Sequence, residues 1–144
     1  RHSRASMVIA DTGFWLALAN TKDRNHRRAV AALRDLREPL ISTWPVLTET
    51  CHLLLTRLGA HAEINFVENF AAGAFHVFDL TEQHRARLGK LMRDYADLPM
   101  DLADASLVLL AEHLAHGRIL STDVRDFRTY RWKNRKPFEN LLEL

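Results

Sequence analysis

Five acidic residues of this chain stand where a predicted strand ends or where a predicted helix begins. Aspartates follow the strands expected at 7–10 and 118–121, and three further carboxylates lie in the first turns of two predicted helices. Because the carboxyl ends of parallel strands meet at one edge of a sheet, we expect these side chains to converge. The five residues are Asp11, Glu49, Asp101, Asp104 and Asp123.

Converging carboxylates without matched lysines or arginines repel one another, and a divalent cation removes that repulsion. Mg²⁺ and Mn²⁺ prefer oxygen ligands, bind one or two carboxylates directly and keep several waters, which further carboxylates hold. Such a site polarises a phosphodiester and lowers the pKa of a water that attacks in line, so no covalent nucleophile is needed. The single cysteine, Cys51, excludes an internal disulfide and the multi-cysteine zinc sites.

Most of these acids also have an ordinary structural interpretation, which the sequence leaves open. Asp101 fits a helix N-cap as well as a metal ligand, Glu49 fits a solvent-facing position on its helix, and Asp123 with Asp126 fits a turn. Asp104 is harder to explain in this way, because it lies between two alanines of an otherwise apolar helix. Burying its charge there costs several kcal/mol unless a cation or hydrogen-bond donors meet it.

The elements that position these acids follow from hydrophobic periodicity. Short apolar runs alternate with amphipathic segments, which indicates strands separated by helices. That alternation is typical of an α/β domain with a parallel sheet and helices on both faces. We expect strands at 7–10, 40–42, 75–80 and 118–121, an edge strand at 130–132, helices at 14–18, 23–36, 45–58, 61–72, 81–95 and 102–115, and a loop or short helix at 123–127.

The composition agrees with one compact domain, since 47% of the residues are hydrophobic and 26% are charged. Residues 1–6 precede Met7 and are interpreted as an expression-tag remnant, which leaves 7–144 as a single domain. The formal net charge of +2 does not by itself imply nucleic-acid binding. No apolar stretch approaches the ~20 residues that span a bilayer, and no secretory signal is present, so we expect a cytoplasmic protein without a membrane partner.

Basic residues are concentrated near the C-terminus. Residues 118–136 hold seven lysines and arginines against two aspartates, a local charge of +5. The interleaved Tyr130 and Trp132 fit stacking on unpaired bases; alternatively, Trp132 packs the sheet edge and the charges form a solvated surface. Candidates for contacts with a phosphate backbone are Arg125, Arg128, Arg131 and Lys133.

Four short motifs resemble the PIN domain family, and in particular the VapC-type toxin ribonucleases of bacterial toxin–antitoxin pairs. The resemblance covers essentially the whole chain from Met7 onward, and the order, spacing and length of the motifs agree together. The motifs are Val8-Ile9-Ala10-Asp11-Thr12, Thr48-Glu49, Met100-Asp101-Leu102-Ala103-Asp104-Ala105 and Leu120-Ser121-Thr122-Asp123-Val124-Arg125-Asp126-Phe127.

The resemblance implies a three-layer α/β/α fold around a central, mainly parallel sheet of four to five strands. It also implies a Mg²⁺- or Mn²⁺-dependent endoribonuclease site, in which Asp11 and Asp104 bind the metal directly and Asp123 completes the cluster or holds a water. The family's core acids fall on Asp11, Glu49, Asp104 and Asp123, with Asp101 and Asp126 as auxiliary acids.

For the remaining site residues, the resemblance leaves alternative roles open. Glu49 positions or deprotonates the attacking water. Thr12 and Thr122 orient a carboxylate or a phosphate, or else they are turn hydroxyls. The implied partners are an RNA substrate, a second copy of the chain in a homodimer, and a small antitoxin, encoded upstream, which inserts a segment into the acidic groove and forms a toxin–antitoxin hetero-oligomer.

Two other functions compete with the nuclease. A catalytically silent PIN-fold module for nucleic-acid binding or regulation would keep the fold, but it would have little reason to hold like charges together. A dehalogenase-type phosphatase needs an aspartate two residues after its nucleophile, where this chain has Gly13. The sequence therefore favours the metal-dependent endoribonuclease.

Overall fold

Five short parallel strands form the centre of the structure, a computed structural model that describes residues 6–143. In the middle lies β1 (Val8–Ala10), between β2 (Leu40–Thr43) and β4 (Arg118–Leu120). The outer strands are β3 (His76–Phe78), beside β2, and β7 (Glu139–Asn140), beside β4. All of β1 and β2 is buried, which explains their unbroken apolar or small-residue sequence.

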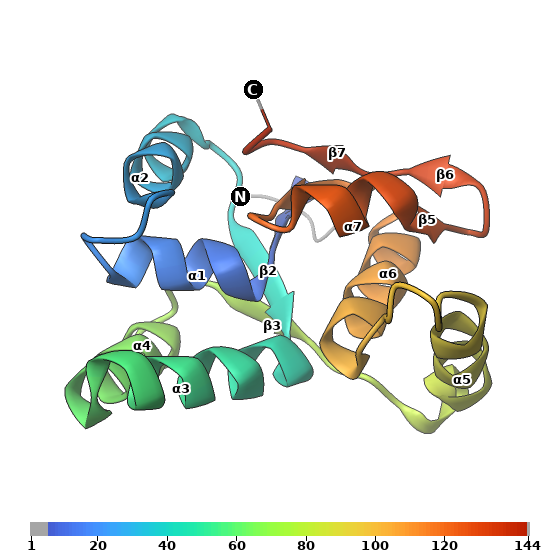
Figure 1. Cartoon of the computed structure of the whole chain (residues 1–144), viewed down its shortest axis with the longest axis horizontal. Helices are drawn as coiled ribbons and strands as arrows, with labels where there is room; N and C mark the ends of the chain where they lie inside the picture. Colours follow the sequence, from blue (N-terminus) through green and yellow to red (C-terminus); the bar gives the residue numbers. More distant parts are fainter. Residues whose placement is uncertain (1–5, 144) are drawn as a thin grey trace.

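Helices cover both faces of this sheet, with α1, α2 and α4 on one side and α5 and α6 on the other (Figure 1). The helix α6 is apolar around most of its circumference because it packs on β1 and β2 and is covered by α3 and α5. This is the three-layer α/β/α architecture predicted from the sequence. The helices are α1 (Thr12–Ala19), α2 (His26–Asp35), α3 (Trp44–Leu58), α4 (Ala60–Ala71), α5 (Arg85–Asp94), α6 (Leu102–Leu114) and α7 (Val124–Thr129).

Local sequence explains where the helices beside the acids begin. Asp11 caps α1, Thr43 caps α3 and Asp101 caps α6, each accepting a hydrogen bond from a backbone N–H. Pro45 stands in the first turn of α3, where its missing N–H is not needed. Because α1 and α3 begin directly after β1 and β2, their first turns lie at the carboxyl edge of the sheet.

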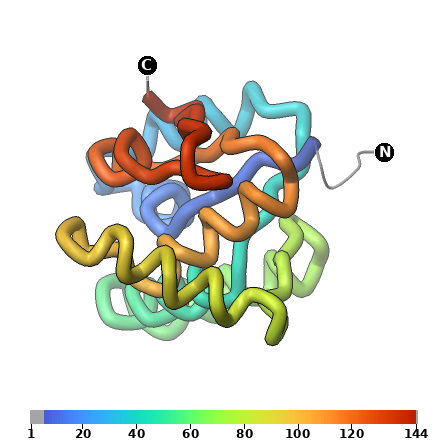
Figure 2. Tube along the Cα trace, turned by 90° about the vertical axis from the view of Figure 1, so that its right-hand side faces the viewer, coloured from blue at the N-terminus to red at the C-terminus, as the bar shows by residue number. Residues whose placement is uncertain are grey.

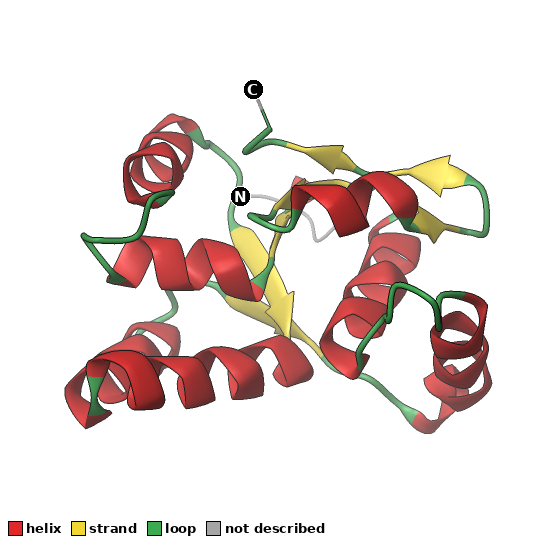
Figure 3. Ribbon diagram, viewed as in Figure 1, coloured by secondary structure: helices red, strands yellow, loops and turns green. Residues whose placement is uncertain are grey.

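The C-terminal strands differ from those expected (Figure 3). The predicted strand at 130–132 is β5 (Arg131–Trp132), but it pairs antiparallel with β6 (Lys136–Pro137) in a separate ribbon instead of forming the edge of the main sheet. The place beside β4 is taken by β7, which was not predicted, because two polar residues carry no periodicity.

The strand β3 is shorter than predicted, and the helix that follows it is divided in two. The strand expected at 75–80 is formed only over β3, and the helix expected at 81–95 begins with a separate 3-10 turn, η2 (Glu82–His84). The imidazole Nδ1 of His84 accepts the backbone N–H of Thr81 at 2.9 Å, which caps this turn. The difference therefore comes from a local capping interaction.

The order of the strands creates a switch point at the carboxyl edge of the sheet. From β1 the chain adds β2 and β3 on one side, and it later adds β4 and β7 on the other side. Figure 2 shows the C-terminal part of the chain folded back beside the N-terminal strand, and Ile9 is paired with Ile119 across this junction. Ligands of open parallel sheets bind at such switch points.

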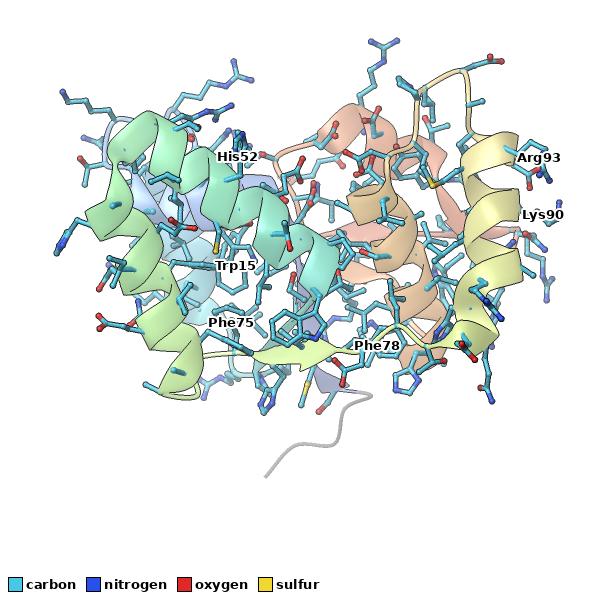
Figure 4. All side chains as sticks on the ribbon, turned by 90° about the horizontal axis from the view of Figure 1, so that it is seen from below. Trp15, His52, Phe75, Phe78, Lys90 and Arg93 are labelled. Carbon is cyan, nitrogen blue, oxygen red and sulfur yellow. The ribbon has the colours of Figure 1, made fainter. Side chains whose placement is uncertain are left out.

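Aromatic side chains fill the layer between α1, α4 and β3. Trp15 of α1 lies 4.4 Å from Phe75 between ring centroids, on the inner side of α4, whereas Lys90 and Arg93 point outward from α5 (Figure 4). Among residues 6–143, no helix is long and apolar enough to cross a membrane. The proposed tag residues 1–6 lie outside the described part of the chain, apart from Ser6.

Candidate active site

Asp11 is the central acid of the site. It follows β1 directly and is only 6% exposed. Its Oδ1 accepts the backbone N–H of Thr12 at 2.7 Å, and its Oδ2 accepts the hydroxyl of Ser121 at 2.8 Å. Burial raises the pKa of Asp11 to about 6, the two hydrogen bonds oppose that rise, and the charges of Glu49 and Asp101 add to it.

Ser121 connects two of the predicted acids and was not among the site residues predicted from the sequence. Its buried hydroxyl donates to Asp11 and accepts the backbone N–H of Asp123 at 2.9 Å. Ser121 also comes directly after β4, so it occupies the switch point together with Asp11. Its place beside Asp123 in the fourth motif was a signal that could have identified it.

Glu49 is held in place by Thr12, the last residue of the first motif. It is half-buried on α3, and its Oε1 accepts the hydroxyl of Thr12 at 2.6 Å. The structure therefore excludes the interpretation of Glu49 as a freely solvated residue and that of Thr12 as a turn hydroxyl, because each binds the other across 37 positions of sequence.

Asp101 and Asp104 form a capping box at the start of α6. Asp101 Oδ1 accepts the backbone N–H of Asp104 at 2.8 Å, so the capping interpretation of Asp101 is realised. Asp104 Oδ2 accepts the hydroxyl of Tyr130 at 3.0 Å. Burial, followed by the charges of Asp101 and Asp11, raises the pKa of Asp104 above the usual range of an aspartate.

Asp123 and Asp126 lie at the beginning of α7. Asp123 is exposed and precedes the helix, and its pKa is raised by partial burial, by its interaction with Asp126 and by the charge of Asp11. The charge of Asp11 therefore interacts with those of Glu49, Asp101, Asp104 and Asp123, which belong to the first half of α3 and to the starts of α6 and α7, as expected from the strand-end rule. Asp126 interacts with Asp123.

Thr122 approaches α1 so closely that a side chain at position 13 would force it to move. A Cβ atom built on Gly13 would lie 1.8 Å from Thr122 Oγ1. Gly13 belongs to the first turn of α1, so this helix begins two residues earlier than the helix expected at 14–18. The close contact fixes the 121–123 segment against the N-terminal end of α1.

The donor set of this cluster fits a hard divalent cation. None of the six acids takes part in the ion pairs described between residues 6 and 143, so their charge is not compensated by lysine or arginine. Within the same residues, no three Asp, Glu, His or Cys side chains are gathered closely enough to enclose a metal by themselves. Mg²⁺ needs no such cage, because it is bound through one or two carboxylates and several waters.

The predicted basic and aromatic residues are largely engaged elsewhere. Arg128 pairs with Glu143, and Arg131 Nη1 donates to three backbone carbonyls. Tyr130 is fully buried and Trp132 is 7% exposed, so the prediction that they stack on bases is wrong. Trp132 instead donates its Nε1–H to the Pro137 carbonyl, in line with the packing alternative.

Two further members of the basic group are placed differently. The Nζ of Lys133 lies 5.9 Å from the centroid of the Trp132 ring, and its backbone N–H donates to Glu112. Arg125 is exposed and takes part in none of the ion pairs of the described residues. The local charge of +5 thus overestimates the number of cationic side chains that are free to bind a ligand.

An exposed aromatic residue borders the acids. Trp44 is 49% exposed and is held by a 2.6 Å hydrogen bond from its Nε1 to Asp79. It lines a groove of about 610 Å³ together with Glu49, Asp101 and the exposed Leu102. The acid cluster therefore opens onto a surface that is partly apolar.

The model of the PIN domain family matches residues 8–133, a span that contains all six acids. The chain belongs to the PIN domain family. Ribonuclease VapC26 of Mycobacterium tuberculosis is 26% identical to this PIN domain over 124 residues, which cover 86% of this chain and 92% of the relative. The crystal structure of VapC20 from the same organism, a sarcin–ricin loop cleaving toxin, has a TM-score of 0.76 at 19% identity and covers 82% of this chain and 91% of its own.

These similarities confirm the resemblance to VapC-type PIN domains that the four motifs indicated. At 19% identity, the likeness to VapC20 shows the common fold and not a common target. The motif residues of this PIN domain meet at the carboxyl edge of its sheet, where the strand order reverses and the acidic charge is concentrated.

Proposed function

We propose that this PIN domain is a Mg²⁺- or Mn²⁺-dependent endoribonuclease, the toxin of a type II toxin–antitoxin system. The observation that carries the proposal is the uncompensated acid cluster around Asp11, supplied by the N-terminal halves of four helices at one sheet edge. The ribonuclease name of its relative VapC26 supports the same reaction class.

Asp11 and Asp104 are the residues that would hold the metal directly, with Asp123 completing the cluster or retaining a water. A bound Mg²⁺ or Mn²⁺ supplies polarisation of the phosphodiester and a water of lowered pKa. Ser121 and the Thr12 N–H orient the two oxygens of Asp11, and the Tyr130 hydroxyl orients Asp104. Partners of this kind fix ligand orientation and affect metal affinity.

Glu49 is placed to handle the attacking water. Thr12 donates to its Oε1, while Oε2 has no hydrogen bond among the described residues. That oxygen is available to orient the water or to accept its proton, and the transfer of that proton to the carboxylate would leave the water oxygen nucleophilic enough for in-line attack. Asp101 and Asp126 then act as auxiliary acids, Asp101 through its cap of α6.

The proposed partners follow from the same relationship. RNA is the substrate, a small antitoxin encoded upstream inhibits the site, and the chain forms a homodimer within a toxin–antitoxin hetero-oligomer in the cytoplasm. The VapC names of both relatives support this assignment. A catalytically silent module is less well supported, because all four core acids are present and uncompensated.

The decisive experiment incubates the purified protein with panels of single-stranded and structured RNA in Mg²⁺, Mn²⁺ or EDTA. Asp11→Asn and Asp104→Asn should abolish cleavage, whereas Asp97→Asn, an exposed aspartate outside the cluster, should retain it. Calorimetric titration with Mn²⁺ gives a second readout that needs no RNA target. Cleavage that survives chelation, or that persists in both cluster variants, contradicts the proposal.

A further inference from the structure

A small polar pocket lies beside the acid cluster and shares no residue with the groove at Trp44. Its volume is about 230 Å³, and its polar walls are Arg24, Asn25 and Arg28 from the start of α2 and Ser121 and Thr122 from the end of β4. The pocket therefore joins a cationic wall to the segment that carries the active-site serine.

The two arginines of this pocket are available to a ligand. Both are exposed, and neither belongs to an ion pair among the described residues. Arg28 has one weak contact, from Nη1 to the Leu142 carbonyl at 3.5 Å, whereas Arg128 and Arg131 near the C-terminus are bound to protein acceptors. The nearest acid in sequence, Asp23, already accepts the Asn25 backbone N–H at 2.7 Å.

The pocket is coupled to the catalytic acids through its other wall. The Ser121 hydroxyl donates to Asp11, and Thr122 precedes Asp123 directly and is pressed against Gly13. An anion in the pocket would thus lie next to the acids, and the guanidinium groups of Arg24 and Arg28 would offset the negative charge of those acids. A polyanionic strand can follow this path, because a cationic contact compensates its repulsion from the acidic centre.

We propose that Arg24 and Arg28, with the Thr122 hydroxyl, form a binding site for an RNA phosphate adjacent to the one that is cut. The proposal rests on the nuclease function above and adds positioning residues to it. A guanidinium fork matches two phosphate oxygens, so the pair would hold the strand in register without reading its bases. Sequence alone favoured the C-terminal cations for this task.

The test measures binding of a fluorescein-labelled single-stranded oligoribonucleotide by anisotropy in EDTA across a KCl series. The Arg24→Ala/Arg28→Ala variant should bind roughly tenfold more weakly, from the loss of charge-assisted hydrogen bonds. Its salt slope should fall by roughly 0.7 for each phosphate contact that is lost. Arg34→Ala/Arg57→Ala removes the same charge from two other exposed helix positions and should change neither quantity.

Two further measurements separate the pocket from the catalytic proposal. On a cleavable RNA, the Arg24/Arg28 variant should raise KM with little change in kcat, and Arg24→Lys/Arg28→Lys should recover part of the affinity. Equal binding and equal salt slopes for the wild type and the alanine variant would overturn the inference while leaving the nuclease untouched. Weaker binding of hexaglutamate with unchanged RNA binding would assign the pocket to an acidic protein segment and would also overturn it.

Discussion

The Ser121 hydroxyl donates to Asp11 Oδ2 at 2.8 Å and so joins residues that are 110 positions apart. The Ser121 hydroxyl oxygen also accepts the Asp123 backbone N–H, so one serine orders two acids that follow neighbouring strands. A buried carboxylate in this arrangement is held in one orientation, which a metal site requires. The serine thereby makes the geometry of the cluster depend on the pairing of β1 with β4.

Replacing Ser121 by alanine should lower activity about 10- to 100-fold, because a hydrogen bond to a charged group is lost. The bond lowers the pKa of Asp11, so its removal should raise that pKa above about 6 and move the acidic limb of the pH–rate profile to higher pH. Ser42→Ala is the matched control, since Ser42 is equally buried but bonds only to the Ala10 carbonyl. An unchanged acidic limb in Ser121→Ala would show that the bond does not tune Asp11.

Tyr130→Phe should weaken Mn²⁺ binding about 10- to 100-fold while preserving the packed ring. The tyrosine hydroxyl lowers the pKa of Asp104, so the phenylalanine variant should need higher pH to bind the ion. Calorimetric titration at two pH values measures both effects. Tyr95→Phe is the control, because the Tyr95 hydroxyl accepts the Arg131 backbone N–H and contacts none of the acids. Equal Mn²⁺ affinity of the wild type and Tyr130→Phe would remove Tyr130 from the site.

Gly13→Ala should destabilise the protein by about 1–3 kcal/mol, the usual cost of overpacking, because the new Cβ meets Thr122 Oγ1. Displacement of Thr122 should also reduce cleavage. In Gly89→Ala, a Cβ meets no atom within 4 Å, so this change in α5 should stabilise by roughly 0.5–1 kcal/mol through helix propensity. Chemical denaturation of both variants measures the contrast, and a stabilised Gly13→Ala protein would contradict the close approach.

The metal-free protein should lose stability as pH rises. Burial raises the folded-state pKa of Asp11 to about 6, above the ordinary aspartate value of 3.8, so the folded state binds this proton more tightly than the unfolded state. The stabilisation is fully present below about pH 4 and is lost as pH passes about 6, a difference on the order of 3 kcal/mol. The raised pKa values of Asp104 and Asp123 extend the loss to higher pH.

Asp11→Asn should therefore unfold at higher urea concentration than the wild type at pH 7.5 in EDTA, and its stability should vary less between pH 5 and pH 7.5. Mg²⁺ should raise the stability of the wild type at pH 7.5 and have little effect on the variant, because the ion binds the folded state through this carboxylate. If the stability of the two proteins changed equally with pH, the charged form of Asp11 would not be destabilised by its surroundings, and this prediction would be wrong.

The sequence by itself determined the layered α/β fold and the edge at which the acids meet. Asp11 follows an apolar strand and Asp104 opens an apolar helix, and the alternation of strands with helices requires a parallel sheet whose carboxyl ends gather together. These conclusions depend on periodicity and chain order, which are local properties. The C-terminal ribbon and β7 carry too few residues for such a signal.

Only the tertiary structure decided which side chains support the acids and which cations remain free. Thr12 meets Glu49, and Tyr130 meets Asp104 and not an RNA base, because helix packing brings together residues far apart in the chain. Arg24 and Arg128 contribute equally to the net charge, but within the described part of the chain only Arg128 is ion-paired, with the carboxylate of Glu143. Whether a charge is available depends on its partners in space, and the sequence does not name those partners.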